Sequence, residues 1–379
     1  MGDAVDSIRR WGEGCDWRGY DPYDALNSPL APYLTLGTAF GRRALTQVVK
    51  RSPVNLRPLL RIKPAHNDKA LGLVASAYAR LAVARGDDTA ADAVRRWLDR
   101  LISDAVVDGG GRAWGYHFDV QTRFFGYAKG TPNTIATSFV AHALLDGLEL
   151  LGDARFGDAA GGATGFLLEH MLDPEEDAPF FSYLPQKREL VHNANLLACS
   201  VAVRTAVLLD EPLDGRVRAA VATSVDAQRT DGSWSYSAGP AGRWVDNFHT
   251  GYVLESLGRC SVLVDGLRPA LERGFDYWER ALFQPDGEPK PTPEHRFPVD
   301  AHDYAQAIET WLSAVEWRGD ALDRARRTAD LLVERMLNAR GYVNFQRGRF
   351  VTNRVPFIRW TTAPAFRALA GLELARSRR

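Results

Sequence analysis

One arrangement recurs along the chain and constrains its fold more than any other feature: a short polar cluster opens a strongly apolar helical run. In Asp246-Asn247-Phe248-His249 the cluster holds an acid, an amide and an imidazole, and the apolar run Tyr252–Val264 follows. Asp246 or Asn247 can cap the start of this helix, because their side-chain oxygens accept hydrogen bonds from the first-turn N–H groups. Comparable openings stand near residues 67, 133, 193, 247, 302 and 360. They predict a repeat of roughly 55–65 residues, which is long for a simple solenoid.

Each repeat also contains a helix of a second kind. Residues 90–103, 156–171, 216–228, 267–282 and 322–338 place charges on one helical face and apolar residues on the other. The runs 135–148, 196–209 and 252–264 carry few charges on any face, which indicates burial on all sides. Half-exposed and buried helices in alternation predict an all-α (α/α)6 barrel, with the buried helices as the inner ring.

We expect a single barrel domain over residues 1–379, with residues 1–30 as an aromatic, turn-rich N-terminal lead and the first helical run at Tyr33–Val49. Short alternating segments between helices, such as Trp114–Phe118 and Tyr342–Gln346, are typical of small hairpins. We expect them to decorate one rim of the barrel.

Charge and cysteine content narrow the classes of partner. The chain has 47 basic and 47 acidic residues and a net charge of +0, so no overall field favours nucleic acid or anionic lipid, although a locally basic pocket stays open. Cys15, Cys199 and Cys260 are too far apart for a disulfide framework or an all-cysteine zinc site. The start of the chain lacks a secretory signal and no apolar run looks long enough to span a bilayer, so we expect a cytoplasmic protein.

The polar openings predict where chemistry takes place. All inner helices of such a barrel run in the same direction, so their N-termini and positive dipole ends converge at one mouth. Capping alone explains any single asparagine or aspartate there. Four of the eight histidines lie at equivalent points of the repeat, however, and this favours a functional pocket.

We expect Asp246 and His249 to form the acid–base centre, because they lie about one helical turn apart. Asp300, His302 and Asp303 open the next inner helix and are further acid–base candidates. The predicted substrate-binding residues are His66, Asn67, Asn133, His192, Asn193, Asn247, Trp244, Tyr304, Arg359 and Trp360.

Several reactions suit these residue types. Two carboxylates on either side of a sugar suit glycoside hydrolysis. A histidine or tyrosine base beside a group that neutralises a uronate suits β-elimination or epimerisation. No cofactor is expected. A divalent metal at Asp246, His249 and His302 is an alternative, which no HxxxH or HExxH spacing supports.

Aromatic and basic residues are interleaved in the segments expected at the rim. Flat rings suit stacking on sugars or enclosing a polyene, and packing of hairpins on helices accounts for a share of them. The basic residues favour an anionic substrate such as a uronate- or phosphate-bearing glycan. The aromatic set is Trp114, Tyr116, Phe118, Phe124, Phe125, Tyr127, Phe180, Phe181, Tyr183, Trp234, Tyr236, Trp244 and Trp360.

Two resemblances follow from these residues. Gln228-Arg229-Thr230-Asp231-Gly232-Ser233-Trp234 resembles the QxxxGxW element of terpenoid cyclases and protein prenyltransferase toroids, although Asp300-Ala301-His302-Asp303 does not match the cyclase DxDD motif. The whole-chain layout is similar to the six-hairpin glycosidase group, which includes unsaturated-uronyl hydrolases, polysaccharide lyases and sugar epimerases. This second resemblance implies a carbohydrate-active enzyme that acts on an anionic glycan in the central pocket. The alternative is an isoprenoid-binding enzyme, and a third hypothesis is a toroid that binds a glycan without catalysis.

Overall fold

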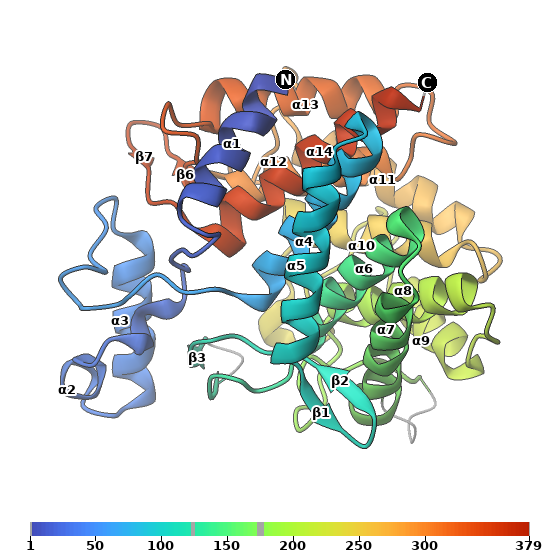
Figure 1. Ribbon diagram of the computed structural model, residues 1–379, viewed down its shortest axis with the longest axis horizontal. Coiled ribbons are helices and arrows are strands. Elements are labelled where there is room, and N and C mark those ends of the chain that lie inside the picture. The colour runs from blue at the N-terminus through green and yellow to red at the C-terminus, as the bar shows by residue number, and fades with distance from the viewer. Residues whose placement is uncertain (1, 123–125, 173–177, 379) are drawn as a thin grey trace.

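Six helices form a closed inner ring. The computed structural model describes residues 2–122, 126–172 and 178–378. Within them each inner helix contacts the next, and the last contacts the first, which closes the barrel (Figure 1). The predicted (α/α)6 architecture is therefore confirmed. The inner helices are α4 (Asp68–Arg85), α6 (Thr134–Leu151), α8 (His192–Leu209), α10 (Asn247–Cys260), α12 (Ala301–Leu312) and α14 (Ala363–Ser377).

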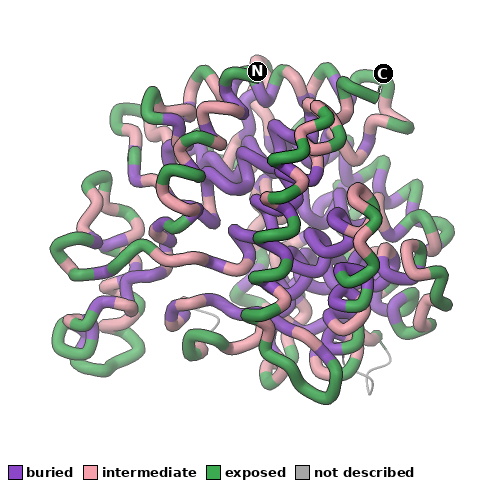
Figure 2. The backbone as a smooth tube through the Cα atoms, viewed as in Figure 1, coloured by how far each residue is buried: buried purple, intermediate pink, exposed green. Residues whose placement is uncertain are grey.

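The outer helices pack around this ring with one face in solvent. In α5, Val94, Trp97, Leu98 and Leu101 are buried at the spacing of a single helical face. Figure 2 shows the resulting contrast between a buried interior and exposed outer turns. The outer helices are α1 (Gly2–Gly14), α5 (Asp88–Asp104), α7 (Ala154–Phe166), α9 (Gly215–Asp226), α11 (Arg268–Leu282) and α13 (Ala321–Met336).

The N-terminal region differs from the sequence expectation. Residues 2–14 form α1, which packs on α14 as the sixth outer helix, because Ala4, Val5 and Ile8 make a buried apolar face. The run expected over 33–49 instead forms α2 (Ala31–Thr35) and α3 (Ala39–Arg51), which project from the barrel at the left of Figure 1. We call residues 31–63 the arm.

Short strands do occur between the helices, but not over the segments expected: residues 114–118 lie between two strands and form none, and the segment 342–346 reaches a strand only at Gln346. β1 (Val106–Asp108) pairs with β2 (Gly111–Ala113), and β3 (Val120–Gln121) pairs with β4 (Gly126–Tyr127). β5 (Val299–Asp300), β6 (Gln346–Arg347) and β7 (Thr352–Asn353) make a three-stranded antiparallel sheet. The remaining short helical turns are Asp24–Asn27, Leu167–Met171, Pro240–Gly242 and Ile358–Thr362.

The QxxxGxW element has a packing role. The Gln228 amide donates to the carbonyls of Gly232 at 3.0 Å and Ala270 at 2.9 Å, and the Trp234 indole donates to the Ser224 carbonyl at 2.7 Å. Gly232 has φ +94°, and a Cβ there would lie 2.3 Å from the Arg273 carbonyl oxygen. The motif thus fastens the loop after α9 to α11, and it lies outside the cavity described below.

Charged side chains from all six inner helices form ion pairs inside the barrel, beyond the first turn of each helix. Arg80 of α4 and Arg367 of α14 both pair with Glu309 of α12, at 2.6 and 3.3 Å. Glu255 of α10 pairs with Arg259 at 2.5 Å. On the other side of the ring, Arg204 of α8 pairs with Asp146 of α6 at 2.9 Å. We call these residues the axial charge ring.

One inner helix has the length and composition of a membrane span. The expectation that no apolar run is long enough to span a bilayer is therefore wrong by length and composition: helix α6 contains an 18-residue apolar window, 78% of which is buried within the protein. Its apolar surface is therefore used in barrel packing.

Cys199 and Cys260 are also buried in the core, as small apolar residues of inner helices, and all three cysteines are unbridged.

Candidate functional site

A cavity of about 640 Å³ opens at the N-terminal ends of the inner helices. Its lining includes the first turns of α4, α6, α8, α10 and α12, together with the π-helical turn before α14 and one side of α3. Of the fifteen predicted site residues, nine line it: Asn193, Trp244, Asp246, His249, Asp300, His302, Asp303, Arg359 and Trp360.

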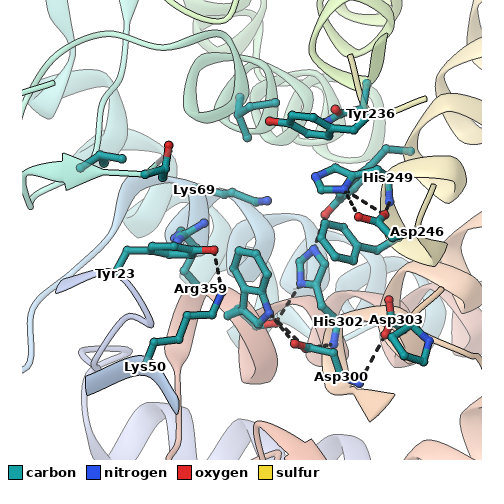
Figure 3. Close-up of a pocket in the computed structure, with 18 of the residues that line it drawn as sticks. Tyr23, Lys50, Lys69, Tyr236, Asp246, His249, Asp300, His302, Asp303 and Arg359 are labelled. Atoms are coloured by element: carbon teal, nitrogen blue, oxygen red, sulfur yellow. Dashed lines mark hydrogen bonds and ion pairs between the residues drawn. The ribbon is translucent and has the colours of Figure 1, made fainter. Parts of the chain in front are cut away.

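His249 and Asp246 form a hydrogen-bonded pair in the cavity wall (Figure 3). The imidazole Nδ1 lies 2.9 and 2.7 Å from the two Asp246 carboxylate oxygens. Because a carboxylate accepts, Nδ1 donates, and the Nε2 lone pair of the neutral ring is left as a base. Nε2 forms no hydrogen bond to another described residue. The Trp244 indole donates to Asp246 Oδ2 at 3.0 Å and helps to hold the carboxylate in place.

Exposure distinguishes this pair from the other acidic residues. The His249 side chain is 23% exposed and that of Asp246 is 13% exposed. Asp300 and Asp303 are only 7% and 1% exposed. Of these groups the imidazole is the one most open to a ligand.

His302 is held neutral at the start of α12. Its Nδ1 donates to the Trp360 carbonyl at 2.8 Å, so its Nε2 accepts from the Tyr252 hydroxyl at 2.7 Å. Burial, reinforced by the positive charge of Lys69, lowers the pKa of His302 well below its usual range. Both ring nitrogens are therefore already hydrogen-bonded within the protein.

Asp300 and Asp303 form a buried acidic pair. Asp300 caps α12, and its carboxylate accepts hydrogen bonds from the Trp360 indole at 3.0 Å and the Gln346 amide at 3.0 Å. Burial raises the pKa of both acids, and the charges of Asp300 and Asp246 raise the pKa of Asp303 further. Burial and mutual repulsion therefore favour the protonated form of one of these two carboxyl groups.

Lys69 is the main feature of the cavity that sequence reasoning missed. It lies in the first turn of α4, is 4% exposed, and forms no hydrogen bond or ion pair with another described residue. Its ammonium lies 4.0 Å from the Phe139 ring centroid and 5.4 Å from that of Tyr252. Burial lowers its pKa well below the usual value, and the nearby Arg359 adds to this effect. Figure 3 shows the side chain directed into the cavity between Arg359 and His249.

A lone lysine at a helix opening of the repeat, ahead of the mostly apolar run 70–79, is the sequence signal that could identify it. It stands two places after Asn67, among openings whose other polar residues are mainly acids, amides and imidazoles.

Arg359 and the N-terminal lead form another part of the wall. Arg359 Nε and Nη2 donate to the two carboxylate oxygens of the fully buried Asp21 at 2.5 and 2.8 Å. This bidentate pair lowers the pKa of Asp21 against the effect of burial. The guanidinium also lies 4.7 Å from the Tyr116 ring centroid. Arg359 is therefore neutralised within the protein, unlike Lys69.

The structure places six predicted binding residues away from the cavity. Asn67 and Asn133 cap α4 and α6. The His66 Nε2 atom lies 2.7 Å from the Asp16 carbonyl oxygen, and His192 Nδ1 lies 3.1 Å from the Ser224 hydroxyl. Asn247 donates to the Leu282 carbonyl at 2.7 Å, and the Tyr304 hydroxyl donates to Glu288. These hydrogen bonds give the six residues structural roles outside the cavity lining.

The metal alternative finds no support in the geometry. Within the described ranges 2–122, 126–172 and 178–378, no group of three histidine, cysteine or acidic side chains is arranged to hold a metal ion. Both nitrogens of His302 are engaged by Trp360 and Tyr252.

Aromatic side chains form much of the rest of the wall. Tyr236 and Trp244 stack with ring centroids 4.5 Å apart, and Trp360 stacks on His302 at 5.0 Å. Of the predicted aromatic set, Trp114, Phe180, Phe181 and Trp234 do not line the cavity, and Phe124 and Phe125 lie outside the described residues. Flat faces beside polar groups suit a sugar ring.

Several solved structures of carbohydrate-processing enzymes have a similar architecture. Cellobiose 2-epimerase from Spirochaeta thermophila matches with a TM-score of 0.60 and 14% identity, covering 82% of this chain and 86% of that one. A GH76 α-mannanase from Bacteroides thetaiotaomicron matches with a TM-score of 0.62 and 11% identity over 82% and 87%. An unsaturated glucuronyl hydrolase specific for heparin matches with a TM-score of 0.58 and 10% identity over 81% and 86%.

The chain has the (α/α)6 toroid fold of these enzymes. The expected resemblance to the six-hairpin glycosidase group is therefore confirmed at the level of the fold. No protein-family model and no curated protein matches the sequence.

Proposed function

We propose that the protein is a carbohydrate-active enzyme that abstracts a proton from an anionic sugar residue of a glycan, with His249 as the base. One observation carries the proposal: the His249–Asp246 pair lines the same aromatic cavity as Lys69, a buried amine without a counter-ion among the described residues. The fold neighbours, which include a sugar epimerase and a glucuronyl hydrolase, support a glycan substrate.

His249 has the features of a general base. Asp246 fixes the ring orientation through Nδ1 and stabilises the imidazolium that forms when Nε2 takes a proton. The rings of Phe248 and Tyr236 lie 4.0 and 4.7 Å from the imidazole ring and restrict its movement. An imidazole base suits proton abstraction at carbon, as in β-elimination or epimerisation.

Lys69 has the features of a carboxylate receptor. A buried ammonium costs free energy unless it is paired, so an anionic ligand group that reaches it restores the charged state. When a base removes the proton next to the carboxylate of a uronate residue, negative charge builds up on the carboxylate oxygens. A cation fixed at that point stabilises the developing charge.

The protonated member of the Asp300–Asp303 pair can complete an elimination. The C–H electrons form the new C=C bond, the bond to the neighbouring glycosidic oxygen breaks, and an acid supplies a proton to that oxygen. Asp303, with its raised pKa, is the candidate acid. In epimerisation the proton instead returns to the opposite face of the same carbon.

Hydrolysis is the second candidate, favoured by the presence of a raised-pKa carboxyl group and the Asp246 carboxylate in one cavity. It ranks lower because Asp246 already accepts hydrogen bonds from His249 and Trp244. The isoprenoid alternative calls for a dry, aromatic pocket. Asp246, Asp300 and Lys69 in the wall, and a QxxxGxW element occupied in packing, speak against it.

The test is incubation with neutral and uronate-containing glycans in D2O, reading ultraviolet absorbance of unsaturated product, new reducing ends, and deuterium at the carbon next to the carboxylate. Absorbance with new reducing ends identifies elimination, and deuterium uptake alone identifies epimerisation. Reducing ends with neither signal identify hydrolysis and refute proton abstraction.

Variants then test the roles of the residues. His249→Ala and Asp246→Asn should lower kcat by about 10²–10⁴-fold, the usual contribution of a general base. Lys69→Met should raise KM for uronate substrates more than for neutral ones. His170→Ala, outside the cavity, is the control. Full activity of His249→Ala on an identified substrate would show that the base is elsewhere.

A further inference from the structure

The arm exposes an unusual share of the apolar surface of the molecule. Fourteen large hydrophobic residues are exposed in the described chain, and half of them lie between residues 33 and 59. Single exposed apolar residues are common, but a concentration of this kind marks an interaction surface. The seven are Tyr33, Leu34, Leu36, Phe40, Val48, Val54 and Leu59, with Leu36 and Phe40 exposed by 84% and 83%.

The backbone of the arm holds one of these side chains in solvent. Leu36 adopts φ +50° at the end of α2, in the left-handed region that non-glycine residues rarely occupy. Its side chain gains no burial within the chain from this conformation. The turn between α2 and α3 therefore presents Leu36 and, four residues later, Phe40 outward.

The same segment is strongly basic. Residues 28–67 contain seven lysines and arginines and no aspartate or glutamate, in a chain whose total charge is zero. Arg57 is buried against Asp24 at 2.7 Å and Arg42 pairs with Asp119 at 3.0 Å. The four basic residues classed as exposed are Arg43, Arg51, Arg61 and Lys63.

A neighbouring hairpin extends this character. The loop between β6 and β7 exposes Phe350 by 86% and Val351 by 61%, with Arg349 and Arg354 exposed beside them. The Asn353 amide donates to the Ser52 carbonyl at 3.0 Å, which joins the hairpin to the end of α3. Both segments lie on the left side of Figure 1.

We propose that the arm is a docking surface for an anionic phospholipid bilayer. Apolar side chains among lysines and arginines are the composition of segments that lie in the membrane interface, where apolar insertion and attraction to anionic headgroups act together. The absence of acidic residues from 28–67 favours an anionic lipid surface over a second copy of this chain, which is electrically neutral. The zero net charge of the whole chain, which by itself disfavours an anionic lipid partner, conceals this local concentration of basic residues.

The arm also borders the cavity. Arg43, Gln47, Lys50 and Arg51 of α3 are part of the cavity lining, whereas Phe40 and Val48 of the same helix are exposed. Docking through α3 therefore holds the cavity next to the membrane. This inference does not depend on which reaction the cavity performs.

The test is sedimentation of the full chain with phosphatidylcholine vesicles, with and without phosphatidylglycerol. We expect binding to the anionic vesicles only, weakening as salt is raised. Arg61→Glu with Lys63→Glu should lower the partition coefficient by about thirty-fold or more, from the contribution per basic residue near a charged bilayer. Leu36→Asp with Phe40→Asp should abolish binding. These four residues are exposed and outside the cavity lining, so the variants should melt like the wild type.

A matched control and an independent signal complete the experiment. Val262→Asp with Arg376→Glu changes an exposed apolar residue and an exposed basic residue outside the arm, and should bind like the wild type. A Phe40→Trp variant should show a blue-shifted emission with anionic vesicles. Wild type that stays in the supernatant with both vesicle types, or arm variants that bind like the control, would overturn the proposal. The proposal would also be overturned if the protein bound no vesicles but formed a dimer that the Leu36→Asp, Phe40→Asp double variant dissociates. The arm would then bind a second copy of the chain.

Discussion

Replacing Lys69 by methionine should make the protein more stable while it weakens binding of anionic substrates. Lys69 is 4% exposed and has no counter-ion among the described residues, so its charged form carries an uncompensated desolvation penalty in the folded state. Methionine has similar length and packs against Phe139 without charge. Replacing buried ionic groups by apolar residues of similar volume gains up to about 4 kcal/mol, and we expect about 2–4 kcal/mol here.

The gain can be converted into a melting temperature. Unfolding entropy of about 2.1 cal/mol/K per residue over the 379 residues of the chain gives an increase of about 3–5 °C. Differential scanning calorimetry at neutral pH measures it directly.

The pH dependence gives a sharper test. Because the folded pKa of Lys69 lies below the unfolded value, the unfolded state binds more protons between these two values, and wild-type stability is lost as pH falls through that window. The advantage of Lys69→Met should therefore shrink towards zero as pH rises to the unfolded pKa, by about 1.4 kcal/mol per unit within the window. Urea unfolding at pH 7 and pH 9.5 measures the difference.

Lys290 provides the matched control. Its ammonium donates to the Ala281 carbonyl at 2.9 Å and to the Pro293 carbonyl, so Lys290→Met removes two hydrogen bonds and should destabilise by about 1–3 kcal/mol. If Lys69→Met were destabilising as well, or if its gain were equal at both pH values, Lys69 would not be a buried unpaired cation and its role as a carboxylate receptor would fail.

Three further predictions concern the scaffold. Gly232→Ala should cost about 2–3 kcal/mol in urea unfolding, because a Cβ at φ +94° would lie 2.3 Å from a carbonyl oxygen; a cost below 0.5 kcal/mol, on the order of an ordinary surface change, would contradict this. Asp21→Asn should cost about 3–5 kcal/mol, since it leaves the buried guanidinium of Arg359 unpaired; an unchanged melting temperature would show that the pair contributes nothing. Burial lowers the pKa of His192 from 6.5 to about 4, so its contribution to stability falls as pH drops from 6.5 towards 4, by about 2–3 kcal/mol at pH 4.5. His192→Gln should lose correspondingly less stability over that range in urea titrations, and an equal loss in both proteins would refute the assignment.

The repeat predicted the barrel because the start of a helix is determined by residues that are adjacent in sequence. Asn67, Asn133, Asp246 and Asp300 each cap an inner helix with their own side chain, as the sequence pattern required. The alternation of apolar and amphipathic helices then left two concentric rings as the arrangement that buries both kinds.

The repeat could not predict which residues at the helix openings face the cavity. An equivalent position along the repeat fixes height on the barrel axis, but successive residues of a helix point about 100° apart. Asn193 therefore lines the cavity while His192 turns back to Ser224, and Asn247 bonds to Leu282 although Asp246 and Phe248 on either side face inward. Direction around the helix axis depends on packing that the sequence pattern does not contain.

The sequence also predicted one helical run at 33–49 as part of the barrel, whereas the structure has two helices in a projecting arm, and the reason is related. A helical period shows that residues 39–51 form a helix, but not the surface on which the helix packs. In α1 the apolar positions are few and three of its thirteen residues are glycines, so its pattern is weak in sequence even though Val5 and Ile8 are fully buried.

The axial charge ring links the barrel to the order in which the chain is synthesised. Glu309 pairs with Arg80, near the start of the inner ring, and with Arg367, in its last helix. Arg80 Nη1 also donates to the Arg367 carbonyl at 3.0 Å. A nascent chain that has not yet released α14 from the ribosome lacks this partner, and burying Glu309 and Glu255 without it costs free energy. We therefore expect the barrel to close only after its final helix has emerged.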